Sequence, residues 1–244
     1  MATPEKRDQV IRMFEGLRLT DVCDAMDAVG LQDTGTMDNE IRPLWRDVEG
    51  FKHRIYGFAP TVRFVPTNRR APSFSSLEEH FRWKRDWYRE LANDHLRENI
   101  KPGDVIVIDA AGTEDVGFIG SNNSLAWTKA GAKGIVTNAG CRDTDEIIKQ
   151  KIPVYSRYIS RGIRPGRLES ESTNKPINCG GVLVRPEDVV VADGDGVIVV
   201  PLEKAQTVAG IAVKIHESDK EGRRKLYEEL GIPRDLTVEA RKLQ

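Results

Sequence analysis

Short, continuous apolar runs predict buried strands in the middle of the chain. The runs 105–108 and 134–137 are too short for helices and have the apolar character of strands covered on both faces. A third strand is expected at 152–156, and helices are expected between the strands at 123–131 and 144–150. This alternation of strand and helix is typical of α/β proteins.

The first hundred residues add two helices and one strand to this prediction. Thr20, followed by acidic residues, predicts a capped helix that ends at Gly30. Residues 56–65 have strand character, and Pro60 confines this strand to an edge or to a late start. Apolar residues near helical spacing, with few helix breakers, predict a long helix at roughly 76–99.

The last third of the chain changes character. Short apolar runs predict strands at 181–184, 189–192 and 197–200. The last two flank Asp-Gly-Asp-Gly at 193–196, which is a strong hairpin-turn pattern. A polar helix rich in Lys and Glu then continues to about Leu230. No internal repeat or low-complexity linker divides the chain, which predicts a single domain over residues 1–244. Within it lie an N-terminal helical arm at 1–19 and a C-terminal helix and tail at 202–244.

Charge and cysteine content narrow the classes of function. The chain has 244 residues, with 37 Lys and Arg against 38 Asp and Glu, so no overall positive field attracts nucleic acid or an anionic membrane. Three cysteines without a C-x-x-C pair indicate a reducing, cytoplasmic setting. No apolar run approaches the ~18 residues of a membrane span, so neither export nor membrane insertion is expected.

Several common catalytic patterns are absent from the sequence. None of the four histidines lies four residues from another, which disfavours a zinc site of the His/Cys kind. Neither a G-x-S-x-G elbow nor a P-loop occurs. The glycines at 112, 117 and 120 follow a strand, but their spacing differs from the G-x-G-x-x-G of dinucleotide-binding proteins.

The best candidate for chemistry combines a helix start with an Arg-Asp pair. If a helix begins near Asn123, the N–H groups of 120–124 could bind a carboxylate or phosphate. Arg142 could pair with a carboxylate or keto oxygen, and Asp143 offers a hard oxygen ligand suited to Mg²⁺ or Mn²⁺. Alternatively, Asp143 caps the helix at 144–150 and Arg142 makes an ordinary salt bridge. The pattern alone leaves both interpretations open.

A family resemblance strengthens the first interpretation. Eight segments in order, spanning roughly residues 20–231, resemble the family of 4-hydroxy-4-methyl-2-oxoglutarate aldolases, which also includes the regulator of ribonuclease activity A. These segments are 21–28, 41–44, 57–62, 102–109, 131–136, 140–143, 180–184 and 191–201.

The resemblance implies a fold and an activity. The fold is a single-domain, layered α/β/β/α sandwich of the ribonuclease-regulator-A-like, phosphohistidine-domain-like type. It is assembled as homotrimers or homohexamers with active sites at subunit boundaries. The activity is that of a lyase dependent on Mg²⁺ or Mn²⁺, which cleaves 4-hydroxy-2-oxo acids to pyruvate without a Schiff base and often decarboxylates oxaloacetate.

The resemblance also assigns roles to particular residues. Asp143 matches the metal-binding aspartate, and Arg142 matches the arginine that polarises the substrate's keto oxygen. A further acid, reaching the site from a neighbouring subunit's C-terminal helix, falls near Glu217, with Glu221 equally placed. The loop whose backbone amides hold the pyruvyl carboxylate corresponds to Gly120, Ser121, Asn122 and Asn123.

One position departs from the family pattern. Ser121 stands where the aldolases have an acid that hydrogen-bonds water on the metal, and Glu114 or Asp115 could supply a carboxylate instead. Two alternatives therefore stay open. The same metal site could run a hydratase, isomerase or decarboxylase reaction on a bulkier acid, or the chain could be a non-catalytic binding protein like the ribonuclease regulator.

Residues 68–100 form a helical insertion relative to shorter members of the resembled family. It carries Trp83 and Trp87 at i, i+4, which suit core or subunit packing or, alternatively, a lid over a larger substrate pocket.

Other candidate residues have simpler explanations. Lys129 and Lys133 are expected on solvated surface rather than as Schiff-base lysines, and Cys141 as a small buried residue. One acid-free run could attract a di- or tricarboxylate or RNA, or could form inter-subunit salt bridges. It contains Arg157, Arg161, Arg164 and Arg167.

Overall fold

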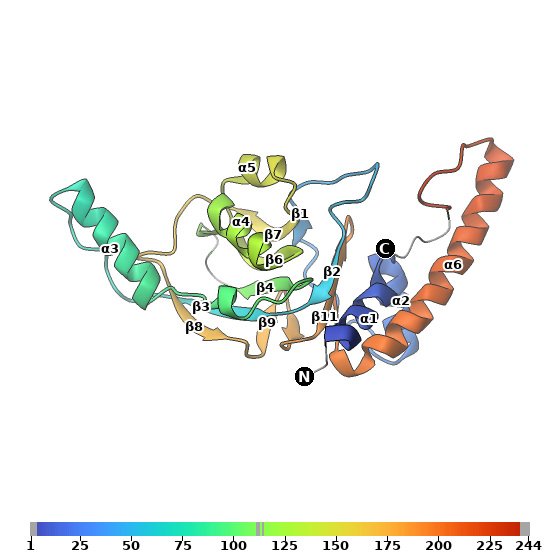
Figure 1. The fold of residues 1–244 in the computed structure, drawn as a ribbon, viewed down its shortest axis with the longest axis horizontal. Helices are drawn as coiled ribbons and strands as arrows, with labels where there is room; N and C mark the ends of the chain where they lie inside the picture. The colour runs from blue at the N-terminus through green and yellow to red at the C-terminus, as the bar shows by residue number, and fades with distance from the viewer. Residues whose placement is uncertain (1–3, 111–112, 114, 240–244) are drawn as a thin grey trace.

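A mixed seven-stranded sheet lies at the centre of the fold (Figure 1). The computed structural model describes residues 4–110, 113 and 115–239. The neighbouring strands β3, β4, β6 and β7 run parallel, β5 adds a parallel pairing to β6, and the two edge strands β1 and β8 are antiparallel. In sheet order the strands are β1 (Arg42–Pro43), β7 (Val154–Ile159), β6 (Gly134–Cys141), β4 (Val105–Asp109), β3 (Thr61–Pro66) and β8 (Leu168–Thr173), with β5 (Gly117–Ile119) beside β6.

A second, antiparallel sheet packs against the first. It consists of β12 (Gly196–Val200), β11 (Val189–Asp193) and β2 (Ile55–Phe58). Asp193 pairs with Gly196 at the end of the β11–β12 hairpin, which confirms the predicted turn. A separate two-stranded ribbon joins β9 (Ile177–Cys179) to β10 (Val182–Val184).

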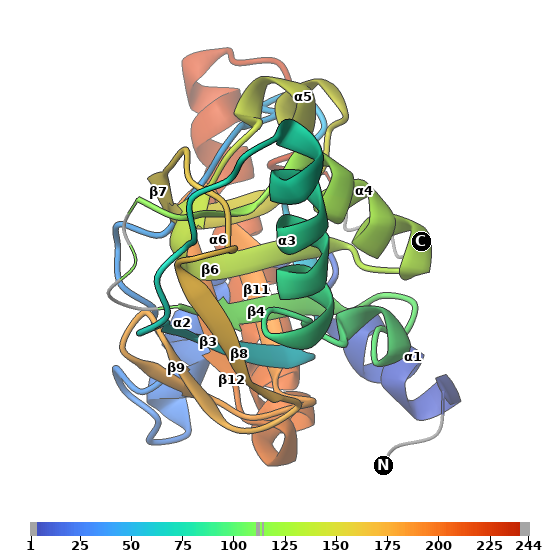
Figure 2. The same ribbon diagram turned by 90° about the vertical axis from the view of Figure 1, so that its left-hand side faces the viewer.

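Helices cover the two outer faces of this double sheet. α4 and α5 lie over the seven-stranded sheet, α1, α2 and α6 lie over the three-stranded sheet, and α3 with its connections projects at the far end (Figures 1 and 2). The layers follow the order α/β/β/α, as predicted for the resembled family. The helices are α1 (Pro4–Phe14), α2 (Leu19–Ala28), α3 (Leu77–Glu90), α4 (Ser121–Ala130), α5 (Thr144–Lys149) and α6 (Ala205–Leu230), with short 3-10 turns η1 (Leu96–Glu98) and η2 (Leu202–Lys204).

Successive residues along the central strands point to opposite faces of the sheet, so they pack into different hydrophobic cores. In β4, Ile106 and Ile108 belong to the core under α4 and α5, whereas Val105 and Val107 pack between the two sheets. Val190 of β11 likewise faces the large sheet, while its neighbours face the helices. Both faces of these strands are buried, which explains why their sequences read as unbroken apolar runs.

The predicted strand at 56–65 is in fact two strands in two different sheets. β2 ends at Phe58 and β3 begins at Thr61, and Pro60 lies between them. Proline has no N–H to donate to a ladder, so it favours a break in pairing at this point. Its carbonyl still accepts a hydrogen bond from the Val107 N–H at 3.0 Å, which guides the chain from one sheet into the other.

The predicted helix at 76–99 is also shorter than expected, because α3 ends at Glu90. Asn93 and Asp94 accept hydrogen bonds on their side chains from backbone N–H groups two residues ahead, at 3.1 Å each. Such local bonds compete with helix formation, and His95 lies in the left-handed region. Trp87 is buried and donates to the Leu168 carbonyl, which supports the packing role of this segment.

Smaller boundary differences occur at other elements. α2 begins at Leu19, so Thr20 is not its cap; Asp21 instead accepts a hydrogen bond from the Arg18 N–H at 2.9 Å. α4 begins at Ser121, two residues earlier than predicted, and β6 extends four residues further, to Cys141. None of the helices in the described part of the chain combines the length and apolar character that a membrane crossing requires.

A buried hydrogen bond fastens α2 to α6. The Asp21 carboxylate lies 2.7 Å from Nδ1 of His216, and both side chains are almost fully buried. Burial alone would raise the pKa of Asp21, but hydrogen bonds from His216 and Arg18 outweigh it and lower the pKa to about 2. The folded protein therefore holds this carboxylate in its charged form more strongly than the unfolded chain does.

This pair predicts a pH dependence of stability. Because the pKa of Asp21 is lower in the folded state, its stabilisation is present above about pH 4 and is lost as the pH falls toward 2. Urea unfolding at pH 6 and pH 2.5 should show that the stability difference between the wild type and Asp21→Asn shrinks by roughly 1–2 kcal/mol at the lower pH. An unchanged difference would contradict the assignment.

Candidate functional site

The topology brings two separate sequence segments to one edge of the large sheet. Arg142 and Asp143 directly follow β6, and α4 begins directly after β5. β5 and β6 are parallel neighbours, with Gly117 paired to Gly140, so their carboxyl ends meet at the same edge. The Arg-Asp pair and the start of α4 therefore lie next to each other, as the resemblance implied.

Hydrogen bonds hold the Asp143 carboxylate against the first turn of α4. Its Oδ2 accepts from the backbone N–H of Ser121 at 3.1 Å and from the Ser121 hydroxyl at 3.2 Å. Asp143 occupies the N-cap position of α5, yet its side chain makes no capping hydrogen bond there. Its backbone is left-handed, with φ at 55°. The carboxylate thus serves the Ser121 contact and not the cap of α5.

The Arg142 guanidinium is held only loosely by its own chain. Nε lies 3.6 Å from Oδ1 of Asp143, and Nη1 lies 3.4 Å from the Arg161 carbonyl oxygen. The side chain is 36% exposed and that of Asp143 is 34% exposed. A positive and a negative group thus stand side by side at the surface, where an anionic ligand can reach them.

The start of α4 supplies additional hydrogen-bond donors. Gly120 is the N-cap, and its carbonyl accepts the first helical hydrogen bond from the Ser124 N–H. Helix geometry leaves the N–H groups of Asn122 and Asn123 without an acceptor inside the helix. These donors and the positive end of the helix dipole lie beside the Asp143 contact and suit a carboxylate.

Two glycines make room for the Arg-Asp pair, a role that the sequence analysis missed. A Cβ at Gly117 would lie 2.6 Å from Cβ of Arg142, and a Cβ at Gly120 would lie 2.9 Å from Oδ2 of Asp143. Both distances are shorter than ordinary carbon contacts. The spacing of these glycines does not match a dinucleotide-binding motif. Glycine is needed at both positions because Arg142 and Asp143 pack closely against them.

We predict that Gly117→Ala impairs the site. The added methyl group would lie 2.6 Å from Cβ and 2.9 Å from Cγ and Cδ of Arg142, so the backbone that carries Arg142 must shift together with its side chain. Catalytic efficiency should fall by about tenfold or more. Gly210→Ala is the matched control, because nothing lies within 4 Å of a Cβ at that position. Equal activity of the two variants, at comparable melting temperatures, would rule out this role for Gly117.

A divalent cation fits the chemistry of this edge. Asp143 offers a carboxylate with one oxygen, Oδ2, fixed by Ser121 and the other, Oδ1, 3.6 Å from Nε of Arg142. Among the described residues, no group of three His, Cys, Asp or Glu side chains converges to form an all-protein metal cage. Mg²⁺ commonly keeps several waters and uses one or two carboxylates together with substrate oxygens, so a single aspartate suffices.

Neither Glu217 nor Glu221 lies at this edge within one copy of the chain. Glu217 and Glu221 are exposed on α6, which packs on α1 and α2 over the three-stranded sheet, on the other side of the double sheet from α4 and α5 (Figure 1). Asp115 is exposed and pairs with Arg161 at 3.1 Å. Glu114 lies outside the described residues. A role for Glu217 therefore requires a second copy of the chain.

The arginine run is largely neutralised within the chain. Arg157 pairs with Asp38 at 3.2 Å, and Arg161 pairs with Asp115. Arg164 is buried, with Asp94 at 3.0 Å and its guanidinium over the Phe118 ring. Arg167 donates to a backbone carbonyl. These contacts leave little of the run available for a ligand, because most of its charge already has a partner.

The remaining candidates match their simpler explanations. Lys129 and Lys133 are exposed at the surface. Cys141 is fully buried, and burial raises the pKa of its thiol to about 12, so it is not a thiolate at neutral pH.

A buried pair that the sequence analysis missed joins β6 to the end of β4. Asn138 of β6 donates to Asp109 at 2.8 Å and accepts from the Ala110 N–H at 2.9 Å.

Comparison with known proteins places the chain in a family. The RraA-like family, described as aldolase/RraA, matches residues 19–199, more than half of the chain. A Halalkalibacterium halodurans protein with the provisional name 4-hydroxy-4-methyl-2-oxoglutarate aldolase is 35% identical over 122 residues, which are 49% of this chain and 56% of that protein. The Legionella pneumophila protein DlpA is 25% identical over 199 residues, 81% of this chain but only 28% of its own length.

Solved structures share the fold. A Streptomyces coelicolor protein, RraAS2, described as an unusual member of the RNase ES inhibitor RraA protein family, has a TM-score of 0.69 and 23% identity. The match covers 88% of this chain and 96% of that one. The chain spans about half the length of the aldolase-named relative and about a quarter of DlpA. By its sequence match and its fold, the chain belongs to the RraA-like family.

Proposed function

We propose that this protein is a divalent-metal-dependent carbon–carbon lyase that cleaves a 4-hydroxy-2-oxo acid and releases pyruvate, and that it also decarboxylates oxaloacetate. The observation that carries the proposal is the convergence of the Arg142 guanidinium, the Asp143 carboxylate and the first turn of α4 at one sheet edge. The aldolase name of the Halalkalibacterium relative supports the same reaction class.

Binding of the substrate's carboxylate falls to the start of α4. The N–H groups of Asn122 and Asn123 point outward from the first turn, and the Ser121 N–H is already taken by Asp143. A 2-oxo acid whose carboxylate accepts from these donors places its keto oxygen toward Arg142. This orientation is fixed by backbone groups, so it is independent of side-chain charge.

Arg142 then stabilises the charge that develops during cleavage. A base removes the proton from the 4-hydroxyl, the C3–C4 bond breaks, and its electron pair moves toward C2 and the keto oxygen. The guanidinium beside that oxygen interacts with it more strongly as negative charge accumulates, and this difference accelerates the reaction. Protonation at C3 completes the formation of pyruvate.

Asp143 would hold the Mg²⁺ or Mn²⁺ ion. When bound, such an ion acts as a Lewis acid on the 2-oxo acid's keto and carboxylate oxygens. The Ser121 contacts fix the Asp143 carboxylate in one orientation, in which it would hold the ion. Ser121 itself adds no charge, so the site has one negative charge fewer than a site with an acid at this position.

The proton acceptor is assigned to Glu217 of a second copy of the chain. Glu217 is exposed on α6, which lies on the other side of the double sheet from α4 and α5 (Figure 1). In a homotrimer or homohexamer with sites at subunit boundaries, α6 of one copy would reach the edge formed by Arg142 and Asp143 of the next. Glu217→Gln should then lower the rate of cleavage while leaving Mn²⁺ affinity nearly unchanged.

Pyruvate release is the test of the proposed reaction. The purified protein is incubated with 4-hydroxy-4-methyl-2-oxoglutarate or oxaloacetate, with Mg²⁺ or Mn²⁺ or with EDTA, and pyruvate is measured with a coupled assay. Release that requires the cation and is lost on adding EDTA supports the proposal. Release that EDTA does not affect, or that Arg142→Ala leaves intact, would refute it.

A non-catalytic binding protein is the second candidate, favoured by the absence of an acid at Ser121. RraAS2, which has the same fold, is described as a member of an RNase-inhibitor family, and this supports a binding role. Calorimetry with Mn²⁺ separates the two candidates, because a binding protein has no need for a cation on Asp143. The absence of Mn²⁺ binding, together with no pyruvate release, would favour this second candidate.

A further inference from the structure

A second candidate site lies well away from Arg142 and Asp143. A cleft of about 1240 Å³ runs between α1, the second half of α6 and the loop before β2. It includes Thr128 near the C-terminal end of α4, whereas the candidate active site is at the N-terminal start of that helix. We propose that this cleft binds a phosphorylated small molecule of about nucleotide size. The proposal goes beyond the lyase activity and does not depend on it.

The cleft concentrates positive charge. Eight Arg and Lys residues line it against three Asp and Glu residues, although the whole chain has a net charge of −1. One of the eight, Arg18, is already paired with Asp21 and Asp219, so the other seven carry the positive charge of the cleft. Arg18 and Lys220 lie on its inner wall, and Lys52 and Lys133 are exposed at its rim. Like charges gathered in one concave surface raise the local concentration of anions.

Buried polar atoms without a partner gather in the same cleft. Within the described part of the chain, such atoms occur on only four residues, and three of these line the cleft. They are Nε2 of His216, Nε of Arg54 and Oε2 of Glu15. A buried polar atom without a hydrogen bond costs free energy, so a polar group that reached these atoms would be stabilised by them.

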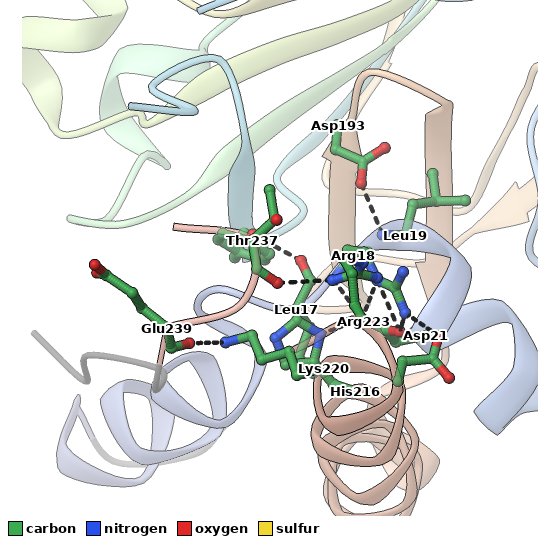
Figure 3. A network of polar contacts seen from close by, with 12 residues as sticks. Leu17, Arg18, Leu19, Asp21, Asp193, His216, Lys220, Arg223, Thr237 and Glu239 are labelled. Atoms are coloured by element: carbon green, nitrogen blue, oxygen red, sulfur yellow. Dashed lines mark hydrogen bonds and ion pairs between the residues drawn. The ribbon is translucent and has the colours of Figure 1, made fainter. Parts of the chain in front are cut away.

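His216 is the strongest of these three. Its side chain is 5% exposed, and its Nδ1 is bound to Asp21 at 2.7 Å, which leaves Nε2 on the other edge of the ring (Figure 3). Lys220 is one helical turn further along α6 and lies beside it in the same view. The Asp21 contact fixes the ring, and with it Nε2, in a single orientation.

The wall opposite α1 is held in place by basic side chains of α6. Lys220 donates to the Glu239 carbonyl at 2.8 Å, and Arg223 donates to the Thr237 carbonyl at 2.7 Å (Figure 3). These bonds pin the segment after α6 along the helix and give the cleft a defined side. Apolar residues such as Ile11 and Tyr227 add surface for the part of a ligand that is not anionic.

Size and charge together select the ligand class. The cavity exceeds the 300–1,000 Å³ range common for drug-sized ligands, so it can hold a molecule larger than a single phosphate ion. Guanidinium and ammonium groups are the usual partners of phosphate oxygens. A donor on the ligand, such as a ribose hydroxyl or an amino group, would give Oε2 of Glu15 the partner it lacks.

Calorimetric titration of the full-length protein tests the proposal. The probes are pyrophosphate and ADP, with adenosine and citrate as comparisons, in low salt with EDTA. Lys52→Glu/Lys133→Glu changes the rim of the cleft, and Lys175→Glu/Lys204→Glu changes exposed lysines elsewhere by the same charge. His216→Gln removes the ring, and its melting temperature is recorded to confirm folding.

We expect pyrophosphate and ADP to bind and adenosine not to bind. The rim variant should weaken ADP binding by about tenfold or more, and the control variant by less than about twofold. His216→Gln should weaken it by about tenfold. No binding of either phosphate probe, equal weakening by the rim and control variants, or citrate bound as tightly as pyrophosphate would each overturn the assignment.

Discussion

Replacing Arg142 with alanine should lower the turnover of a 4-hydroxy-2-oxo acid by about 10²–10³-fold, because the guanidinium acts where negative charge develops. Its two contacts within the chain are long, at 3.4 and 3.6 Å, so its loss should cost little stability. The measurement is steady-state pyruvate release together with a melting curve. The effect should appear in kcat as well as in kcat/KM, because the interaction strengthens in the transition state.

Arg142→Lys separates charge from geometry. Lysine keeps the positive charge but lacks the planar fork of arginine, so partial recovery of activity is expected. Arg161→Ala is a matched control, because this neighbouring arginine is exposed and pairs with Asp115. An Arg142→Ala enzyme that retains wild-type kcat and changes only KM would show that the guanidinium binds substrate without assisting cleavage.

Replacing Asp143 with asparagine should abolish high-affinity Mn²⁺ binding. Asparagine has nearly the same shape and its carbonyl oxygen can still accept from Ser121, but it lacks the negative charge that a divalent cation requires. Mn²⁺ affinity measured by calorimetry should fall by about 100-fold, and pyruvate release should fall at least as far.

The control for this change lies two residues away. Asp145→Asn removes the same charge from an exposed position in the first turn of α5. Its Mn²⁺ affinity should stay within about twofold of the wild type. Tight Mn²⁺ binding by the Asp143→Asn protein would mean that the cation is held elsewhere and that Asp143 has only a structural role.

The buried part of the fold is well predicted from the sequence because its signal is local and strong. The β4 run 105–108 is apolar at every position, and the structure buries it on both faces. The hairpin after β11 follows from its Asp-Gly-Asp-Gly turn. The end of α6 follows from Gly231, which adopts a left-handed C-cap.

Boundaries set by tertiary structure could not be predicted in the same way. The residues 56–65 have one continuous strand pattern, and only the presence of two sheets explains why the chain changes partners at Pro60. The end of α3 depends on the Asn93 and Asp94 side chains, which compete locally with the helix. The strand at 56–65 and the end of the helix at 76–99 were both predicted wrongly. In the first, strand pairing in two sheets outweighs the local hydrophobic pattern, and in the second, side-chain hydrogen bonds do so.

The candidate site was predictable in its residues but not in its packing. The resemblance pointed to Arg142, Asp143 and the segment 120–124, and β5 and β6 bring these together. The need for Gly117 follows only from the close approach of Arg142, which has no sequence pattern of its own. The cleft beside His216 draws on residues from α1, α6 and distant loops, so no local motif could indicate it.

The most direct test of the central claim is a crystal structure with Mg²⁺ and oxalate, which mimics the planar 2-oxo acid portion of the substrate. The account predicts a cation on the Asp143 carboxylate, oxalate oxygens on that cation, one oxalate oxygen beside the Arg142 guanidinium and a carboxylate at the N–H groups of Asn122 and Asn123. A structure in which cation and oxalate both bind away from Asp143 and Arg142 would contradict it.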